Sequence, residues 1–159
     1  MSAVLVTGAA GFIGSHVAEA LVARGARVVG LDNFDPFYAR EIKERNLAGL
    51  VGRDAFELVE GDVRDEELVA RLFAGRKIDL VVHLAAKAGV RPSVKAPALY
   101  ADVNVRGTAV ILAAAARAGT KRIVYASSSS VYGAGAAAPF AEDAPVDRPL
   151  SPYAATKRA

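Results

Sequence analysis

Short aliphatic and β-branched runs alternate along the chain with stretches in which apolar residues recur at helical spacing. The runs predict strands at 3–7, 27–31, 56–61, 79–85 and 122–127. Each run is almost continuously apolar, which is typical of strands that are buried on both faces. The stretches between them predict helices near 12–24, 40–49, 65–74 and 93–118.

Four residues support these helix boundaries. Gly25 and Gly119 follow the first and last helix, where a residue in the left-handed conformation commonly ends a helix. Asp65 and Ser93 stand at the start of the third and fourth helix, where a side-chain oxygen can accept hydrogen bonds from the first turn. We expect all four residues to act as caps.

Repeated strand–helix units predict an α/β fold, with a parallel sheet that carries helices on both faces. We expect the doubly wound (Rossmann) arrangement with strand order 3-2-1-4-5, in which ligands bind at the carboxyl ends of strands 1 and 4. Residues 1–159 then form one domain. A Gly/Ala/Pro-rich loop at 133–149 follows the last strand, and a loop of this length is commonly functional.

Composition narrows the class of protein. The 159 residues are 53% hydrophobic with a mean hydropathy of +0.25, which fits a globular domain with a buried sheet. The net charge is +3 and the charges are scattered, as in REIKER at 40–45, which indicates solvated helix surface rather than a nucleic-acid interface. Cysteine is absent from the sequence, so disulfides and thiolate metal sites are excluded. We expect no bound metal ion.

Hydropathy gives no sign of a membrane segment. The longest apolar helical run, 109–116, is bracketed by Arg106 and Arg117 and is too short to span a bilayer. The first residues lead directly into a strand and show no signal sequence. We therefore expect a cytoplasmic protein that binds neither a membrane nor nucleic acid.

A glycine-rich turn, TGAAGFIG at 7–14, links the first predicted strand to the first helix. Gly8, Gly11 and Gly14 leave the backbone bare, so that a diphosphate can approach the free N–H groups at the start of the helix. A glycine triplet alone is weak evidence, because helix–strand crossings also favour glycine. The strand–turn–helix context strengthens it and predicts a dinucleotide site.

Two acidic residues end the neighbouring strands. Asp32 ends strand 2, where a carboxylate can accept both hydroxyls of an adenosine ribose and would repel a 2′-phosphate. This favours NAD over NADP as the cofactor, and the alternative is a helix N-cap or turn aspartate. Asp62 ends strand 3, where two interpretations stay open: a contact with the adenine edge together with Val63, or a turn residue.

Four motifs together carry a resemblance to a known family. They are TGAAGFIG (7–14), HLAAKAGV (83–90), SSSSVYG (127–133) and YAATK (153–157). In combination they resemble the extended short-chain dehydrogenase/reductase family, and more narrowly its nucleotide-sugar epimerases. The stretches 31–47 and 83–93 are most similar to those of UDP-glucuronate 4-epimerases. The resemblance covers essentially the whole chain.

The resemblance implies an NAD site and a catalytic triad. The cofactor-binding residues it implies are Gly8, Gly11, Phe12, Ile13 and Gly14 at the diphosphate, Asp32 and Asn33 at the ribose, Asp62 and Val63 at the adenine, and Leu84, Ala85, Ala86 and Lys87 beyond strand 4. Tyr153 would be the acid/base, Lys157 would hold the nicotinamide ribose, and Ser128 would complete the triad. Relatives often carry glutamine at the position of Lys87, and a lysine adds positive potential near an anionic ligand.

Tyr153 and Lys157 are spaced to act together. They lie four residues apart and so share one face of a helix. A phenol has an unperturbed pKa of about 10, and a nearby ammonium favours the phenolate that can take a hydroxyl proton. Ser128, at the end of strand 5, can hydrogen-bond the same substrate oxygen. The alternatives are a chance pair on a solvated helix and an ordinary loop serine.

The residues after Ser128 distinguish reactions within the family. Dehydratases and decarboxylases that resemble this chain carry acidic residues where Ser129 and Ser130 stand. Hydroxyl groups cannot serve as the acid/base pair of an elimination, so 4-epimerisation of a UDP-sugar is favoured. Arg91, after strand 4, is either a contact for an anionic group of the substrate or a surface arginine. His83 is expected to be a packed strand-end residue.

Relatives in this family are longer, with a carboxyl-terminal region that encloses the nucleotide-sugar. The chain is therefore expected to be a fragment that ends in the catalytic helix, retains NAD binding and lacks turnover. For the full-length protein we expect a homodimer through the 93–118 helix and the Tyr153 helix. The alternatives are a UDP-glucose 4-epimerase, a dehydratase or decarboxylase of the family, and a non-catalytic NAD-binding module.

Overall fold

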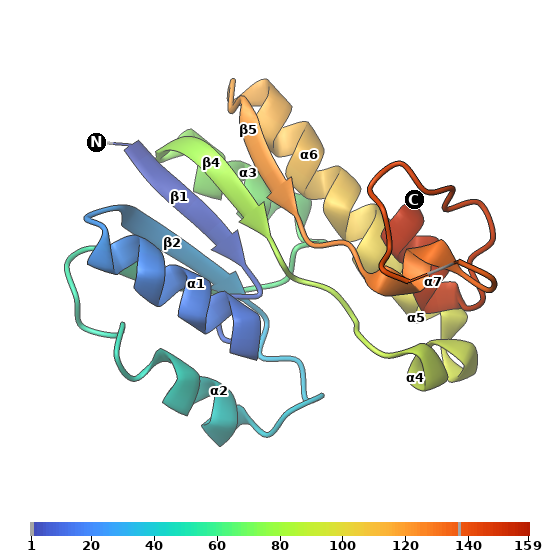
Figure 1. Ribbon diagram of the computed structural model, residues 1–159. Coiled ribbons are helices and arrows are strands. Elements are labelled where there is room, and N and C mark those ends of the chain that lie inside the picture. Colours follow the sequence, from blue (N-terminus) through green and yellow to red (C-terminus); the bar gives the residue numbers. More distant parts are fainter. Residues whose placement is uncertain (1, 137) are drawn as a thin grey trace.

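A five-stranded parallel sheet forms the centre of the computed structural model, which describes residues 2–136 and 138–159 (Figure 1). Its strands, in spatial order β3-β2-β1-β4-β5, are β1 (Ser2–Thr7), β2 (Arg27–Asp32), β3 (Phe56–Glu60), β4 (Lys77–His83) and β5 (Arg122–Tyr125). The predicted α/β fold and strand order are confirmed. Because all neighbouring strands are parallel, their carboxyl ends meet at one edge of the sheet.

Helical segments connect the strands. They are α1 (Phe12–Ala23), α2 (Arg40–Leu47), α3 (Glu66–Ala74), α4 (Val90–Lys95), α5 (Pro97–Tyr100), the π-helix η1 (Ala101–Arg106), α6 (Gly107–Arg117), the 3₁₀ helix η2 (Ser129–Tyr132) and α7 (Pro152–Arg158). The π-helix η1 joins α5 to α6 without a break. Figure 1 shows α4, α5 and α7 gathered beyond the arrowheads of the strands, so these helices border the carboxyl edge.

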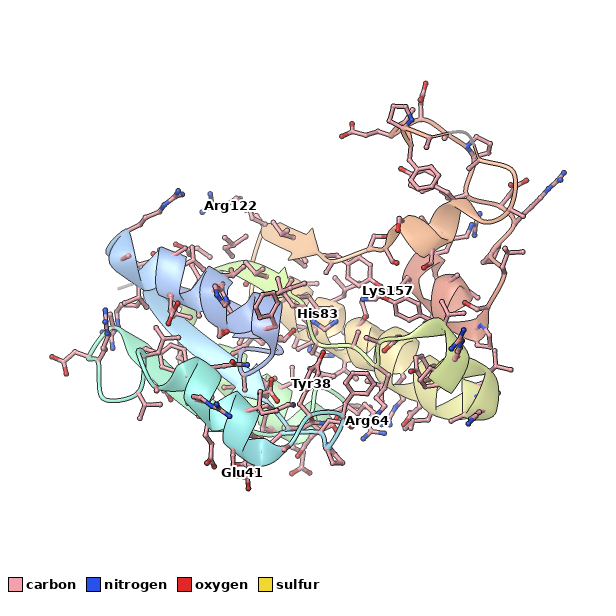
Figure 2. All side chains as sticks on the ribbon, turned by 60° about the horizontal axis from the view of Figure 1, so that its bottom comes forward. Tyr38, Glu41, Arg64, His83, Arg122 and Lys157 are labelled. Carbon is pink, nitrogen blue, oxygen red and sulfur yellow. The ribbon has the colours of Figure 1, made fainter. Side chains whose placement is uncertain are left out.

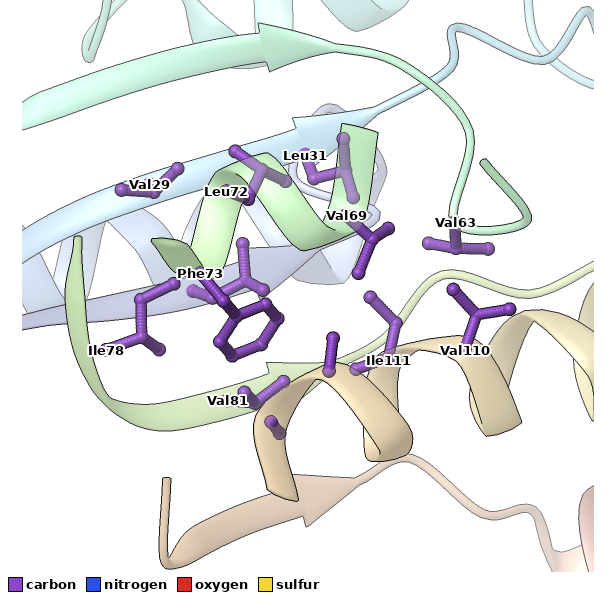
Figure 3. Close-up of a cluster of buried hydrophobic side chains, with 13 residues drawn as sticks. Val29, Leu31, Val63, Val69, Leu72, Phe73, Ile78, Val81, Val110 and Ile111 are labelled. Carbon is purple, nitrogen blue, oxygen red and sulfur yellow. The ribbon is translucent and has the colours of Figure 1, made fainter. Parts of the chain in front are cut away.

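Two apolar clusters fill the space between the sheet and its helices. One includes Leu5 and Val81 and lies under α3 and α6 (Figure 3). The other includes Val6 and Val82 and lies on the opposite face under α1 and α2. Consecutive strand residues point to opposite faces, so each pair of neighbours serves both clusters. This explains why the central strands are apolar without alternation.

Strand β5 departs from this pattern. It was expected to be buried on both faces, but Ile123 is 37% exposed and Val124 is 55% exposed. The expectation is wrong here because β5 lies at the edge of the sheet and pairs only with β4 within the described residues. An apolar run predicts a strand but does not fix its position in the sheet.

The helix predicted at 93–118 is not a single helix. The chain forms α4, leaves the helical conformation at Ala96 (φ −138°, ψ 55°) and begins a new helix at Pro97. A residue before proline is driven out of the helical region, and proline suits the first helical position. Ser93 is therefore not an N-cap: it lies inside α4, where its hydroxyl donates to the carbonyl of Val90 at 2.6 Å.

The other three predicted caps are confirmed. A carboxylate oxygen of Asp65 accepts a hydrogen bond from the N–H of Leu68 at 3.0 Å. Gly25 and Gly119 follow α1 and α6 with φ of 81° and 76°. Only glycine adopts this conformation without a steric cost, so the two glycines end their helices and turn the chain toward the next strand.

The continuous helical stretch Pro97–Arg117 is long and apolar enough, by length and composition, to cross a membrane. The apolar run at 109–116 is by itself too short to cross a membrane, but the helical stretch that contains it begins earlier, at Pro97. Its residues Val110 and Ile111 belong to the cluster under the sheet, and 44% of its most apolar part is buried inside the protein. A core helix of a globular domain passes the same test, and this packing is of that kind.

Replacing Leu5 by alanine should lower the free energy of unfolding by about 2–5 kcal/mol, because this side chain in the central strand is fully buried. Leu150 is the matched control, since it is 71% exposed. Its replacement by alanine should change the free energy of unfolding by less than about 0.5 kcal/mol. Urea denaturation followed by circular dichroism measures both, and equal losses would contradict the assigned core.

Candidate active site

A cleft of about 180 Å³ opens at the carboxyl edge, between the segments that follow β1, β2, β3 and β4. The residues proposed from sequence that line it are Gly8, Gly11, Asp32, Asn33, Val63, Leu84, Ala85, Ala86 and Lys87. It lies where a doubly wound sheet changes the direction of its strand order, which is the usual ligand site of this fold. The structure therefore brings most of the predicted cofactor residues together.

The glycine turn after β1 is closely packed against the chain that follows β4. Gly8 has φ of 70°, and a Cβ on it would lie 2.9 Å from the backbone nitrogen of Ala85. A Cβ on Gly14 would lie 2.0 Å from the carbonyl oxygen of Gly8. Neither contact leaves room for a side chain, so glycine is required for both the turn and the approach of α1.

The amino terminus of α1 meets the cleft at its N-cap, Gly11, whereas Phe12, Ile13 and Gly14 are not among the residues that line the cleft. Its N-cap is Gly11, so no side chain caps the helix there, and the first turn begins with Phe12 and Ile13, whose side chains are exposed. The N–H groups of Phe12, Ile13 and Gly14 precede the first possible intrahelical partner. Unpaired N–H groups and the positive end of the helix dipole form a site that favours a phosphate group.

Asp32 is buried at the end of β2, and its carboxylate accepts hydrogen bonds from three donors. Its Oδ1 accepts from the N–H of Phe34 at 2.8 Å and from Lys43 Nζ at 3.1 Å. Its Oδ2 accepts from the N–H of Ala10 at 3.0 Å, which ties β2 to the glycine turn. The carboxylate is thus held rigidly at the floor of the cleft, with its negative charge balanced by the Lys43 ammonium.

Lys43 was missed by the sequence analysis, which took 40–45 as solvated surface. Its side chain is only 8% exposed, and its ammonium lies 5.8 Å from the centre of the Phe34 ring. The signal was present in the spacing: Lys43 and Leu47 stand four residues apart on the buried face of α2. The prediction of solvated surface holds for Glu41 and Glu44 and is wrong for Lys43.

Asp62 stands between Gly61 and Val63, which line the cleft, but is not itself a lining residue. Its carboxylate accepts from the backbone N–H and guanidinium of Arg64 and from the side-chain amide of Asn33 at 2.9 Å. Arg64 continues to Asp102 in η1, with Nη1 to Oδ2 at 2.7 Å. These hydrogen bonds, first those of Arg64, hold the pKa of Asp62 well below its ordinary value despite partial burial. Asp62 therefore links three segments, and its contact with adenine stays a prediction.

A chain of hydrogen bonds runs behind the cleft through His83. The Thr7 hydroxyl accepts from the N–H groups of Leu84 and Ala85, and so donates to His83 Nδ1 at 2.7 Å. His83 Nε2 lies 3.0 Å from the Thr108 hydroxyl. Burial, and then the charge of Lys157, lower the pKa of His83 to about 4. The imidazole is therefore neutral at pH 7, as expected for a packed strand-end residue.

Asn104, in the π-helix η1, fixes the segment that carries the cleft wall. Its Oδ1 accepts from the N–H of Lys87 at 2.7 Å, and its Nδ2 donates to the carbonyl of Lys87 at 3.1 Å. The same Nδ2 donates to the Thr156 hydroxyl of α7 at 3.0 Å. Buried and fully hydrogen-bonded, Asn104 joins the loop after β4 to the helix of the proposed catalytic pair.

Ser151 is the N-cap of α7, and its hydroxyl oxygen accepts a hydrogen bond from the N–H of Ala154 at 3.1 Å. Tyr153 packs edge-on against Tyr100, with 6.3 Å between ring centres. Lys157 donates from Nζ to the carbonyl of Ala126 at 2.8 Å, at the carboxyl end of β5. Burial lowers the pKa of Lys157 to about 8. Lys157 and His83 line the same cavity, and Figure 2 shows the two labelled side chains near each other.

The structure does not join the predicted triad to the cleft. Among the described residues, those that line the cleft include neither Ser128 nor Tyr153, and Lys157 lines a separate cavity of about 390 Å³ between β5 and α6. Ser128 accepts from the N–H of Ser130 as the N-cap of η2. Ser129, in η2, and Arg91, in α4, are both exposed, and they lie in elements that are far apart in the sequence. The triad and the substrate contacts stay predictions.

A doubly wound parallel sheet, a glycine turn after β1 and a buried acid after β2 define a dinucleotide-binding domain of the extended short-chain dehydrogenase/reductase type. The chain belongs to the GDP-mannose 4,6 dehydratase family, whose sequence profile matches residues 5–159. This assignment confirms the resemblance drawn from the four motifs.

Two relatives show which members of the family are similar to this chain in sequence. UDP-glucuronate 4-epimerase 4 of Arabidopsis thaliana is 46% identical over 98% of this chain and 36% of the relative. UDP-glucuronate 4-epimerase of Thermodesulfobacterium geofontis is 44% identical over 97% of this chain and 47% of the relative. The chain therefore spans about a third to a half of the length of these epimerases.

Solved structures agree. UDP-glucuronic acid 4-epimerase from Bacillus cereus, in complex with UDP-glucuronic acid and NAD, superposes with a TM-score of 0.87 at 37% identity, over 99% of this chain and 49% of that one. UDP-glucose 4-epimerase from Thermotoga maritima, with UDP-glucose, gives 0.86 at 34% identity over 99% and 48%. dTDP-glucose 4,6-dehydratase from Streptomyces venezuelae, with NAD, gives 0.85 at 36% identity over 99% and 48%.

The buried lysine of α7 predicts a specific dependence of stability on pH. Because the pKa of Lys157 is about 8 in the folded chain and higher in the unfolded chain, the unfolded chain binds more protons between these values. Relative to Lys157→Met, the free energy of unfolding of the unaltered chain should rise from pH 8 to pH 10 by an amount on the order of 1–3 kcal/mol.

Denaturation at several pH values measures this difference, and the exposed Lys95 provides the control. Lys95→Met should follow the unaltered chain at all pH values. A flat difference for Lys157→Met would show that the ammonium is solvated.

Proposed function

We propose that this chain is the NAD-binding part of a nucleotide-sugar 4-epimerase that acts on UDP-glucuronate. The observation that carries the proposal is the start of α1, which no side chain caps and whose N-cap Gly11 lines a cleft together with Asp32. The absence of room for a Cβ on Gly8 and Gly14 fits a turn shaped for close approach to a diphosphate. Support for the cofactor comes from relatives with NAD bound, at 36–37% identity.

The residues present fit a dinucleotide. The proposed contacts are Gly8, Gly11, Phe12, Ile13 and Gly14 for the diphosphate, Asp32 and Asn33 for the adenosine ribose, Asp62 and Val63 for adenine, and Leu84, Ala85, Ala86 and Lys87 along the cofactor beyond β4. When bound, NAD supplies a site that accepts hydride from a sugar carbon and returns it. Asp32 retains unused lone pairs for hydroxyl donors, so the ribose contact is compatible with its present partners.

Proton transfer is assigned to α7. We assign Tyr153 as the base that takes the proton of the sugar 4-hydroxyl and later returns it, and Ser128 as a donor to the same oxygen. Lys157 is a buried cation one turn further on, where an ammonium favours a nearby phenolate and can hold the second ribose. Its present bond to Ala126 keeps it at the end of β5, beside the segment that carries Ser128.

The substrate is inferred from similarity and from chemistry. Ser129 and Ser130 lack the acid/base groups of an elimination, which favours epimerisation over dehydration. The UDP-glucuronate 4-epimerases at 44–46% identity favour a substrate with a carboxylate, and Arg91 is the proposed partner of an anionic group. A UDP-glucose 4-epimerase is the second candidate, because such an enzyme superposes with a TM-score of 0.86.

A cytoplasmic homodimer is proposed for the full-length protein. The helical stretch Pro97–Arg117 and α7 are the proposed contacts, because Leu112 remains 44% exposed on that stretch. An exposed leucine on a helix whose other side is buried is suited to pack against a second helix.

NADH should bind the chain, and binding should depend on the bare turn. Gly11 has an ordinary backbone conformation, and a Cβ on it would lie 3.2 Å from the carbonyl oxygen of Gly8. Gly11→Ala should therefore fold with a small shift of the turn, and because Gly11 lines the cleft, the added methyl group should weaken binding about tenfold. Gly75→Ala, outside the cleft, is the matched control and should bind as the unaltered chain does. NADH fluorescence measures both. Failure of the unaltered chain to bind would refute the proposed cofactor.

A chimera tests the reaction. The chain would replace the corresponding amino-terminal part of the Thermodesulfobacterium geofontis epimerase, of which it covers 47%. The chimeric enzyme should epimerise UDP-glucuronate at C4 and leave UDP-glucose unchanged, as followed by NMR of the sugar protons. Tyr153→Phe should lower the rate at least about a hundredfold and retain the cofactor. Turnover of UDP-glucose in preference would favour the second candidate.

A further inference from the structure

An ion pair joins the two loops that form opposite walls of the cleft. Lys87 Nζ lies 3.0 Å from each carboxylate oxygen of Asp35. Asp35 belongs to the loop after β2 and Lys87 to the loop after β4, and both residues line the cleft. The side chain of Lys87 is 20% exposed and that of Asp35 is 29% exposed, so the pair lies at the boundary between the cleft and the solvent.

Both ends of the ion pair are anchored. The Asp35 side chain accepts from the N–H of Phe37 at 3.1 Å, and its own N–H donates to Asn33 Oδ1 at 3.0 Å. The backbone of Lys87 is fixed by two hydrogen bonds to the buried Asn104. The pair therefore links two rigid supports, and it can open by rotation of the Lys87 side chain alone.

The cleft is small for a dinucleotide while the pair is closed. Its volume of about 180 Å³ lies below the range of about 300–1,000 Å³ that is typical of small-molecule sites. We propose that the Lys87–Asp35 pair is a latch across the mouth of the cleft, which opens to admit a dinucleotide and, once closed again, slows its departure. This inference rests on the proposed function, because it assumes that the cleft holds a dinucleotide.

Lys87 is also one of the proposed cofactor contacts, and the alternative to a latch is that its ammonium contacts a phosphate of the bound ligand permanently. The two roles predict opposite effects of removing the Asp35 charge. If Lys87 serves the phosphate, Asp35→Asn frees the ammonium and strengthens binding, whereas Lys87→Gln weakens it. If the pair is a latch, either substitution opens it, so both change the rates in the same direction and the double variant adds nothing further.

The test uses the 159-residue chain and NADH in a stopped-flow fluorimeter. Association is followed after mixing, and dissociation by displacement with excess NAD. Lys87→Gln and Asp35→Asn should each raise both rates about fivefold, the factor expected for a partly exposed ion pair of roughly 1 kcal/mol. The double variant should match the single variants, and the charge exchange Lys87→Asp with Asp35→Lys should restore slow rates.

Lys95→Gln, which removes an exposed charge outside the cleft, is the matched control and should leave the rates unchanged. Circular dichroism verifies that each variant folds, and if Asp35→Asn does not, Lys87→Gln against Lys95→Gln decides alone. Unchanged rates in Lys87→Gln, or opposite shifts in affinity for the two single variants, would overturn the latch. If the unaltered chain binds no NADH, the proposed function fails and the latch fails with it.

Discussion

The close approach of two backbones at the end of β1 is the constraint on which the rest of the site depends. Gly8 packs against the backbone of Ala85 and Gly14 against Gly8, with no space for a Cβ at either place. This contact sets where α1 begins and turns its unpaired N–H groups toward the edge of the sheet. A side chain at either position would displace the helix, and the cleft would lose its positively polarised end.

The remaining polar groups hold the segments after the strands in register with this turn. Asp32 bonds the glycine turn through Ala10, and Thr7 bonds the segment after β4. Asn104 then ties that segment to α7 through Thr156. A series of buried and partly buried hydrogen bonds thus runs from the glycine turn to the helix of Tyr153 and Lys157. Helix α7 has only seven residues and would be marginal alone, so these contacts position it.

Much of this arrangement is predictable from sequence, because it depends on local patterns. Apolar runs and glycine spacing predict the sheet, its strand order and the uncapped start of α1. The position of Asp65 before a helical pattern predicts that it is an N-cap. The rest depends on contacts between distant segments. Lys43 is buried only because Asp32 lies opposite it, and the Lys87–Asp35 pair exists only because two loops meet. The break at Ala96 in the helix predicted at 93–118 could have been predicted from Pro97, which follows it. The exposure of β5 could not, because it depends on the position of this strand at the edge of the sheet.

The central claim is that the first turn of α1 binds a diphosphate through backbone N–H groups. The most direct measurement is the amide NMR spectrum of the ¹⁵N-labelled chain during a titration with NAD. The account predicts that the resonances of Phe12, Ile13 and Gly14 show the largest shifts, toward lower field, as these groups become hydrogen-bonded. Unmoved resonances at these three positions in a chain that does bind NAD would contradict the account.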